Sequence, residues 1–400
     1  MPEAESAGGG TDAGAGPRRG SLRRRLGGGV VFLVLTLLFV LPWSTLFVFG
    51  VHWPFPVFLA GTVLFLGGLV SFPFLMAAGH GRRRADRAAR VADSTLGIVW
   101  VLFTWSVLGD LVHLVLIALG ADGGVAGSRL VAGAVAVVAT TLLCWGHYEA
   151  MRVPRVRRQE IRIPRLGAGL DGTRVVVLAD THYGPIDRAR WSARVTEAVN
   201  ALDADIVVHA GDIADGTAEQ RREQSAPLGT IRARSAKVYV TGNHEYYSEA
   251  QGWLDRMTEL GWEPLHNRHL TVERGGDRLV VAGVDDVTAE HSGLAGHSAD
   301  LAGALAGTDA DDPVLLVAHQ PKYVDRAAAA GIDLQISGHT HGGQIWPFRY
   351  LVRVDQPVVS GLSRHGDRTQ LYTSRGTGFW GPPFRVFAPS EITLLTLRAE

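Results

Sequence analysis

Aspartate, asparagine and histidine residues recur in five short segments of the second half of the sequence. The segments read DTH (180–182), GD (211–212), GNHE (242–245), AHQ (318–320) and GHTH (338–341). Carboxylate, amide and imidazole groups suit divalent cations such as Mn, Fe, Zn and Mg. Cys144 is the only cysteine, which excludes an intramolecular disulfide and a thiolate zinc site. These residue types therefore indicate a site that binds divalent metals.

Each of the five segments follows an apolar run with the composition of a buried β-strand. The runs are RVVVL (174–178), DIVVH (205–209), KVYV (237–240), PVLLV (313–317) and IDLQI (332–336). Helical stretches are expected at 186–202, 217–234, 247–260 and 322–330, so the pattern predicts an α/β domain. Ligands of open α/β sheets lie beyond the carboxyl ends of the strands. We therefore expect all five segments to meet at one edge.

Each segment alone has a simpler explanation. Gly211 and Asp212 could form an ordinary turn, and Asn243 could cap a helix. Their joint occurrence after five strands favours a common site. Glycines precede several of the ligands, at positions where a positive φ or a close approach of the backbone to a metal is expected; these are Gly211, Gly242 and Gly338.

The order of these motifs resembles that of the calcineurin-like metallophosphoesterase superfamily, with all five motif blocks present over residues 172–398. The segments GHTHGGQ (338–344), YTSRGTG (372–378) and APSEITLLTL (388–397) are similar to the membrane-attached branch that includes bacterial phosphodiesterases of the YkuE and YaeI type. The resemblance implies an α/β fold, a four-layer sandwich of two mixed sheets flanked by helices.

The resemblance also implies two divalent cations that share a nucleophilic hydroxide. One cation would be held by Asp180, His182, Asp212 and His341, and the other by Asp212, Asn243, His319 and His339. Asp212 would bridge the two, because one carboxylate can offer an oxygen to each cation. His244 belongs to neither set, and it is expected to hydrogen-bond the phosphoryl group or to protonate the leaving oxygen.

Four residues beside the motifs are candidates for supporting contacts. Glu245 is expected to orient His244. Arg375 could meet a phosphate bidentately, or form a surface ion pair. Tyr183 and Tyr246 could line the pocket or simply pack.

The first part of the chain contains four apolar segments long enough to cross a bilayer, at 30–50, 54–77, 96–120 and 130–146. Residues 1–158 carry 15 arginines and 8 acidic residues, whereas residues 159–400 carry 24 basic and 31 acidic residues. The arginines cluster before the first segment, between the second and third, and after the fourth. The positive-inside rule therefore predicts a multi-pass protein of the cell membrane with both termini, and the metal-binding domain, in the cytoplasm.

These patterns divide the chain into four regions. We expect a disordered basic N-terminus (1–28), a four-helix transmembrane region (29–150), a linker (151–171) and a catalytic domain (172–400). The first apolar segment is too long for a signal peptide and is interpreted as an uncleaved helix. Asp110 and His113 lie one turn apart in the third span, where they could form an ion path or hydrogen-bond within the helix bundle.

The function indicated is that of a membrane-anchored dinuclear phosphoesterase, in particular a phosphodiesterase. The alternatives are a pyrophosphatase of lipid-linked nucleotides of the UDP-diacylglucosamine type, a membrane sensor or scaffold with a regulatory metal domain, and transport through the helices. Lipid-linked and nucleotide phosphate esters both remain open as substrates. Nucleic acid is not an expected partner, because the domain is acidic and lacks basic clusters. Metal identity, monoester or diester preference and oligomeric state stay open.

Overall fold

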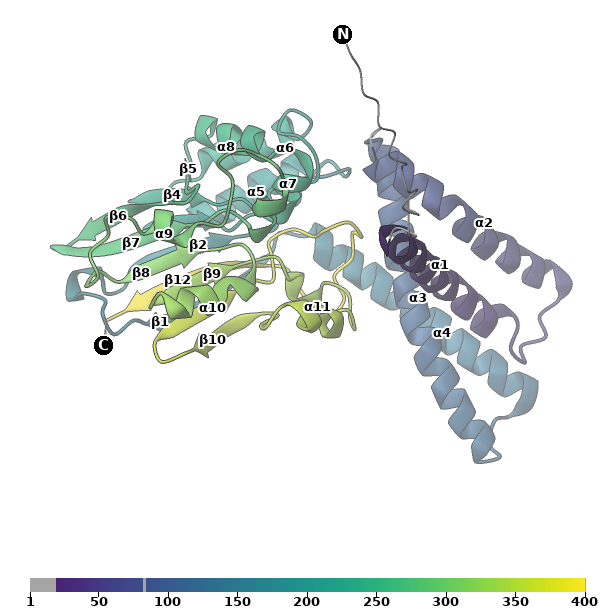
Figure 1. The fold of residues 1–400 in the computed structure, drawn as a ribbon. Helices are drawn as coiled ribbons and strands as arrows, with labels where there is room; N and C mark the ends of the chain where they lie inside the picture. Colours follow the sequence, from purple (N-terminus) through teal and green to yellow (C-terminus); the bar gives the residue numbers. More distant parts are fainter. Residues whose placement is uncertain (1–18, 82–83, 400) are drawn as a thin grey trace, which may run out of the picture.

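The computed structural model describes residues 19–81 and 84–399 and divides them into a helical bundle and an α/β lobe (Figure 1). The bundle consists of α1 (Arg19–Phe47), α2 (Phe55–His80), α3 (Asp86–Ala118) and α4 (Gly124–Met151). α1 thus begins at Arg19, ten residues before the expected boundary. The expectation of disorder for residues 1–18 falls outside the described residues.

The four helices are candidate membrane spans by length and composition. Their apolar side chains point outward as well as inward, because the bundle interior can hold only part of them. Leu64 of α2 and Val137 of α4 are 70% and 67% exposed, whereas Phe39 and Phe72 pack together inside. Helices that are apolar all round are typical of membrane spans. Inside the bundle, Thr45 donates a hydrogen bond to Asp110 over 2.7 Å, which is the structural role considered for that carboxylate.

The α/β lobe contains two six-stranded mixed sheets. The first has the order β1-β12-β2-β3-β4-β5, and the second has the order β10-β11-β9-β8-β7-β6. Their strands are β1 (Arg155–Arg162), β2 (Arg174–Leu178), β3 (Ile206–His209), β4 (Ala236–Tyr239), β5 (Glu263–Pro264), β6 (Arg268–Arg274), β7 (Asp277–Gly283), β8 (Val314–Val317), β9 (Leu334–Ser337), β10 (Gly361–His365), β11 (Thr369–Thr373) and β12 (Glu391–Arg398).

Helices cover the outer faces of the sheets, and this confirms the expected four-layer sandwich. They are α5 (Ala189–Asn200), α6 (Arg222–Ser225), α7 (Asn243–Ser248), α8 (Ala250–Glu259), α9 (Leu301–Ala304), α10 (Val324–Ala329) and α11 (Arg349–Asp355). One core lies between the two sheets, where Val177, Val208 and Leu315 are fully buried. Trp253 of α8 belongs to the core outside the first sheet, and Ala327 of α10 to the core outside the second. Central strands buried on both faces explain the continuous apolar runs in the sequence.

The segment expected to be a linker contributes a strand instead. β1 pairs in parallel with β12 along its whole length, from Arg155 opposite Glu391 to Arg162 opposite Arg398. It is an edge strand, and its charged side chains remain mostly exposed. Arginines on an edge strand discourage pairing with another chain. Because of these arginines, the segment is not an apolar run and was not recognised as a strand from the sequence.

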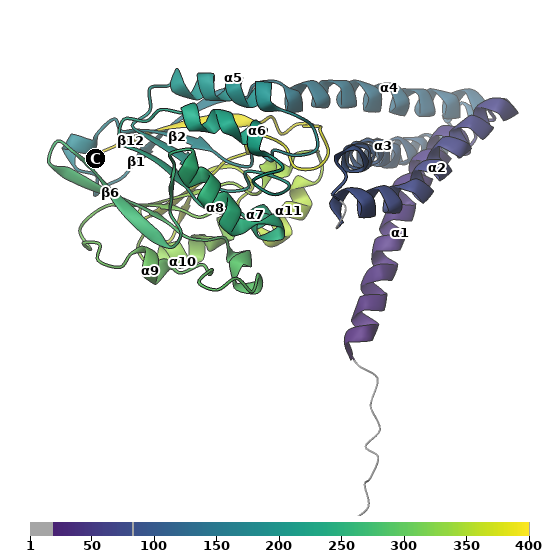
Figure 2. The same ribbon diagram turned by 90° about the horizontal axis from the view of Figure 1, so that it is seen from above.

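The bundle and the lobe are packed against each other, with α4 leading directly into the lobe (Figure 2). Arg221 of the lobe binds both carboxylate oxygens of Asp86 at 2.6 and 2.7 Å. Gly97 of α3 lies so close to the loop after β11 that a Cβ atom would come within 2.5 Å of the Phe384 ring. His147 of α4 hydrogen-bonds the Pro383 carbonyl over 3.0 Å. Close packing at Gly97 thus fixes α3 against the lobe.

We predict that Gly97→Leu destabilises the protein, because the added side chain has no space at this contact. Overpacking of this kind costs about 1–3 kcal/mol, so the melting temperature of the full chain in detergent should fall. Gly133→Leu is the matched control, because no atom lies within 4 Å of a Cβ at Gly133 on α4. Equal melting temperatures for the two variants would contradict the close packing of α3 on the lobe.

Candidate metal centre

The five predicted segments meet at the carboxyl ends of five strands from both sheets. Asp180 and His182 follow β2, Asp212 follows β3, and Asn243 follows β4. From the second sheet, His319 follows β8, and His339 and His341 follow β9. The three strands of the first sheet are parallel neighbours, as are the two of the second. Adjacent parallel strands therefore deliver all these side chains to one place.

The backbone is strained at most of these positions. Asp180, His182, Asp212, His339 and His341 all have a positive φ, between 42° and 70°. Residues other than glycine rarely adopt this conformation, and where they do, it is commonly at functional sites.

Two of the predicted glycines are needed for space. A Cβ atom at Gly338 would lie 2.6 Å from Asp180 Oδ2, and a Cβ atom at Gly242 would collide with Asp212 Oδ1. Both glycines allow a neighbouring strand end to approach a buried carboxylate. This agrees with the close approach expected from the sequence.

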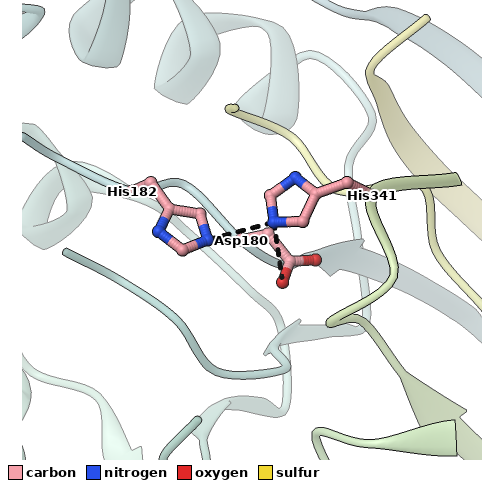
Figure 3. Close-up of side chains that lie close together, drawn as sticks. All are labelled: Asp180, His182 and His341. Atoms are coloured by element: carbon pink, nitrogen blue, oxygen red, sulfur yellow. Dashed lines mark hydrogen bonds and ion pairs between the residues drawn. The ribbon is translucent and has the colours of Figure 1, made fainter. Parts of the chain in front are cut away.

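Asp180, His182 and His341 form the first group of donors (Figure 3). Their potential ligand atoms face one another, with His182 Nε2 lying 3.1 Å from His341 Nε2 and His341 Nε2 lying 3.8 Å from Asp180 Oδ1. Asp212 Oδ2 approaches the same region, 3.6 Å from His182 Nε2. All four side chains are buried.

Asp212, Asn243, His319 and His339 form the second group. His319 Nε2 lies 3.2 Å from both Asp212 Oδ2 and Asn243 Oδ1. His339 completes the group, within 4.8 Å of the Asp212 and His319 donor atoms. Asp212 stands between the two groups, and burial opposes its ionisation, but His319 and His244 hold its pKa well below the usual value. The carboxylate is therefore ionised and shared.

The donors fit divalent cations, because two of their buried polar atoms have no other partner. Asp180 Oδ2 and His339 Nδ1 are buried without a hydrogen bond, an arrangement that is costly unless something binds there. Burial lowers the pKa of His339 to about 3 and, together with the His182 ring, places that of His341 well below its usual value. Neutral imidazoles of this kind are the form that coordinates metals.

His244 borders the donors, and Asp215, which the sequence analysis missed, orients it. Asp215 Oδ1 lies 2.6 Å from His244 Nδ1 and 3.1 Å from His182 Nδ1. Burial lowers the pKa of His244, but Asp212 and Asp215 outweigh it and raise the pKa to about 9. Asp215 thus holds a protonated imidazole in place and directs His182 Nε2 toward the first group. The only indication of Asp215 in the sequence is that a further carboxylate stands shortly after Asp212.

Glu245 does not orient His244 as expected. Its carboxylate accepts backbone N–H groups from Gly242 (2.6 Å), Ile213 (2.8 Å) and Asp212 (3.0 Å). Burial and the nearby Asp212 raise the pKa of Glu245 to about 7. The residue therefore ties the loops after β3 and β4 together, a role set by backbone groups that motif spacing does not reveal.

The other three supporting candidates have the structural roles that were considered as alternatives: the two tyrosines pack or hydrogen-bond within the lobe, and Arg375 forms an ion pair. Tyr183 is buried, and its hydroxyl hydrogen-bonds Ser192 over 2.7 Å. The Tyr246 hydroxyl lies 3.1 Å from His297 Nδ1, in a separate cluster. Arg375 forms a 3.8 Å ion pair with Glu391.

A second missed residue, Arg385, holds the loop that carries His341. Its buried guanidinium donates hydrogen bonds to the carbonyls of His341 and Ala388, both over 3.0 Å, and to that of Gly378. Burial lowers the pKa of Arg385 to about 9. Because its partners are backbone carbonyls, and that of His341 lies 44 residues away in the sequence, nothing in the local pattern indicated this role.

Comparison with known proteins relates the chain to one family. Residues 173–343 match the calcineurin-like phosphoesterase family. The chain is 34% identical to a "Transmembrane protein with metallophosphoesterase domain" from Danio rerio, over 75% of this chain and 70% of that protein. The Bos taurus protein of the same name is 38% identical, over 66% of this chain and 62% of its own length. An "Uncharacterized metallophosphoesterase YkuE" from Bacillus subtilis is 28% identical, over 58% of this chain and 81% of that protein.

These relatives confirm the resemblance inferred from the motifs. The matched family region begins at β2 and ends just after His341, so it contains every predicted metal ligand. The Danio rerio and Bos taurus relatives carry the word transmembrane in their names, in keeping with the four apolar helices. The chain belongs to the calcineurin-like phosphoesterases, which are hydrolases of phosphoric esters.

Proposed function

We propose that the chain is a multi-pass membrane phosphodiesterase whose two-cation centre faces the cytoplasm. The observation that carries the proposal is the convergence of seven donors, six of them buried and His339 partly buried, with Asp212 between the two groups and donor atoms of Asp180 and His339 left without another partner. A purely structural metal site would not require His244 beside it, which disfavours the sensor or scaffold alternative.

Asp180, His182, Asp212 and His341 would hold one cation, and Asp212, Asn243, His319 and His339 the other. When bound, the two cations would supply an activated water and neutralise charge on the phosphoryl oxygens. Mn, Fe, Zn and Mg all suit these donors.

His244 would act on the substrate directly. Asp215 anchors its ring, the nearby carboxylates raise its pKa, and its side chain is 18% exposed beside the donors. A charged N–H in this place can donate to a phosphoryl oxygen and pass its proton to the leaving oxygen. Asp215 would keep the ring in this orientation.

The position of the lobe supports the cytoplasmic assignment. The last residues of α4 and the first turn of α3 contact the lobe through His147 and Asp86. These ends lie beside the arginine-rich segments of the sequence, and such segments remain on the cytoplasmic side.

We predict that Asp212→Asn loses bound metal and lowers turnover of bis-p-nitrophenyl phosphate by more than about 100-fold, because loss of the shared charge leaves two cations repelling each other. Metal content and hydrolysis of the purified full chain in detergent with Mn²⁺ provide the measurement. Asp255→Asn serves as the control, because Asp255 is exposed and bonded only to Gln251. Unchanged metal content in Asp212→Asn would rule out the shared role of Asp212.

We predict that His244→Gln retains both cations but lowers kcat by about 10²–10⁴, the range for loss of a general acid. Asp215→Asn should lower kcat by about 10–100-fold, since it disturbs the orientation of His244 and His182. Steady-state kinetics with metal content measured on the same samples separates these effects. Full activity of His244→Gln would show that the imidazole has no part in the chemistry.

A further inference from the structure

A cavity of about 430 Å³ opens beside the metal-binding donors, and a candidate membrane helix forms part of its wall. Its lining includes Asp212, His244 and His341 from the lobe. Leu96 and Trp100 of α3 line it from the bundle. The volume lies within the range of small-molecule sites. The site is therefore completed by the bundle, and a substrate in it would touch both parts of the protein.

Apart from the histidines at the metal donors, His244 among them, no basic side chain lines the cavity in the part of the chain that the structure describes. The Asp355 carboxylate is paired with Lys322 over 3.1 Å. A substrate with a second phosphate, such as a nucleoside diphosphate ester, would find only the metal centre and His244 to neutralise it. The charge pattern thus fits one phosphoryl group attached to an uncharged remainder.

Several polar side chains outside the donor groups are already hydrogen-bonded within the protein. The Gln344 amide bonds the backbone of Trp380 and Pro382, the Thr340 hydroxyl bonds the Val359 carbonyl, and the Trp100 indole bonds the Ile345 carbonyl over 3.3 Å. Gln356 is likewise occupied by Lys322 and Gln320. A sugar or a base would find few free partners, whereas a hydrocarbon needs none.

The surface around the cavity is apolar and exposed. Trp380 lines the cavity and is 44% exposed, and on α11 no residue is buried, with Leu351 56% exposed. α11 lies on the side of the lobe that faces the bundle in both views (Figures 1 and 2). Exposed apolar groups next to membrane helices are typical of a surface that contacts the bilayer.

We infer that the substrate is a lipid phosphate ester of the adjacent leaflet, with one hydrocarbon chain in this cavity and its phosphoryl group at the metal donors. This inference rests on the proposed function and names its substrate class. α3 passes from the bilayer to the cavity wall, so a lipid beside it reaches the site without leaving the apolar phase. The apolar lining residues, such as Leu96 and Trp100, then hold the hydrocarbon chain. Asp212 and His244 mark the place where the ester bond is cleaved.

The test is a series of p-nitrophenyl alkyl phosphate diesters, from ethyl to octyl, hydrolysed by the full chain in amphipol with Mn²⁺. Because burial of a methylene group contributes a nearly constant increment, kcat/KM should rise about tenfold for every two methylene groups. The readout is kcat/KM for the octyl ester divided by kcat/KM for the ethyl ester. A loss of activity that affects both esters equally cancels in this ratio. A ratio near one, with the ethyl ester still hydrolysed, would overturn the lipid inference and leave the proposed function standing.

Two variants test whether the hydrocarbon chain of the substrate lies in this cavity. Val352→Trp fills the cavity from α11, and Leu96→Trp fills it from α3. Both should reduce the octyl-to-ethyl ratio at least tenfold. Val354→Trp, on the same helix but 86% exposed and outside the cavity, should keep it. An unchanged ratio in both cavity variants would place the chain elsewhere and overturn the inference.

Two further measurements distinguish other occupants. Thymidine 5′-p-nitrophenyl phosphate hydrolysed faster than the octyl ester would assign the cavity to a nucleoside. In nanodiscs, the p-nitrophenyl ester of dioctanoyl phosphatidate should outcompete the soluble octyl ester, and the reverse order would exclude a bilayer lipid. If no ester is hydrolysed, the proposed function fails. Binding of octyl phosphate then tests separately whether the cavity holds an alkyl chain. Binding no tighter than that of inorganic phosphate would overturn the lipid inference.

Discussion

The structure depends on the burial of acidic and imidazole groups at one edge of two sheets. Asp180 and Asp212 are almost completely inaccessible, and each lies within 4.8 Å of a ring nitrogen of His182. Burial and, to a smaller extent, the nearby Asp212 raise the pKa of Asp180 to about 6, so a charged carboxylate is unfavourable there without a partner. Cations remove this penalty, because each charge then has a partner. The positive φ angles, the glycines at strand ends and the buried Arg385 all serve to hold these donors together against their own repulsion.

Most of the donor set could be predicted because each donor follows a continuous apolar run, and the carboxyl end of a central strand has a defined position. Asp215 and Arg385 could not be predicted in the same way. Asp215 acts through the ring nitrogens of His182 and His244, and Arg385 acts through carbonyls, so neither contact leaves a spacing in the sequence. Glu245 was found by its place in a motif, but its partners are backbone N–H groups. β1 was missed because edge strands need not be apolar.

The apolar helices were also visible in the sequence, but their relation to the lobe was not. From the sequence, the two parts were expected to be separate regions joined by a linker. In the structure they share an interface, in which Gly97 allows close packing and Asp86 binds Arg221. Such contacts depend on small residues and single ion pairs far apart in the chain. The shared interface places Leu96 and Trp100 beside the metal donors, so α3, a candidate membrane span, forms part of the wall of the cavity at those donors.

The central claim, that two cations share Asp212, is tested most directly by anomalous diffraction from crystals of the full chain grown with Mn²⁺. The account predicts two peaks about 3.5–4 Å apart, one among Asp180, His182 and His341 and the other among Asn243, His319 and His339, with Asp212 contacting both. A single peak, or two peaks that do not both contact Asp212, would contradict it.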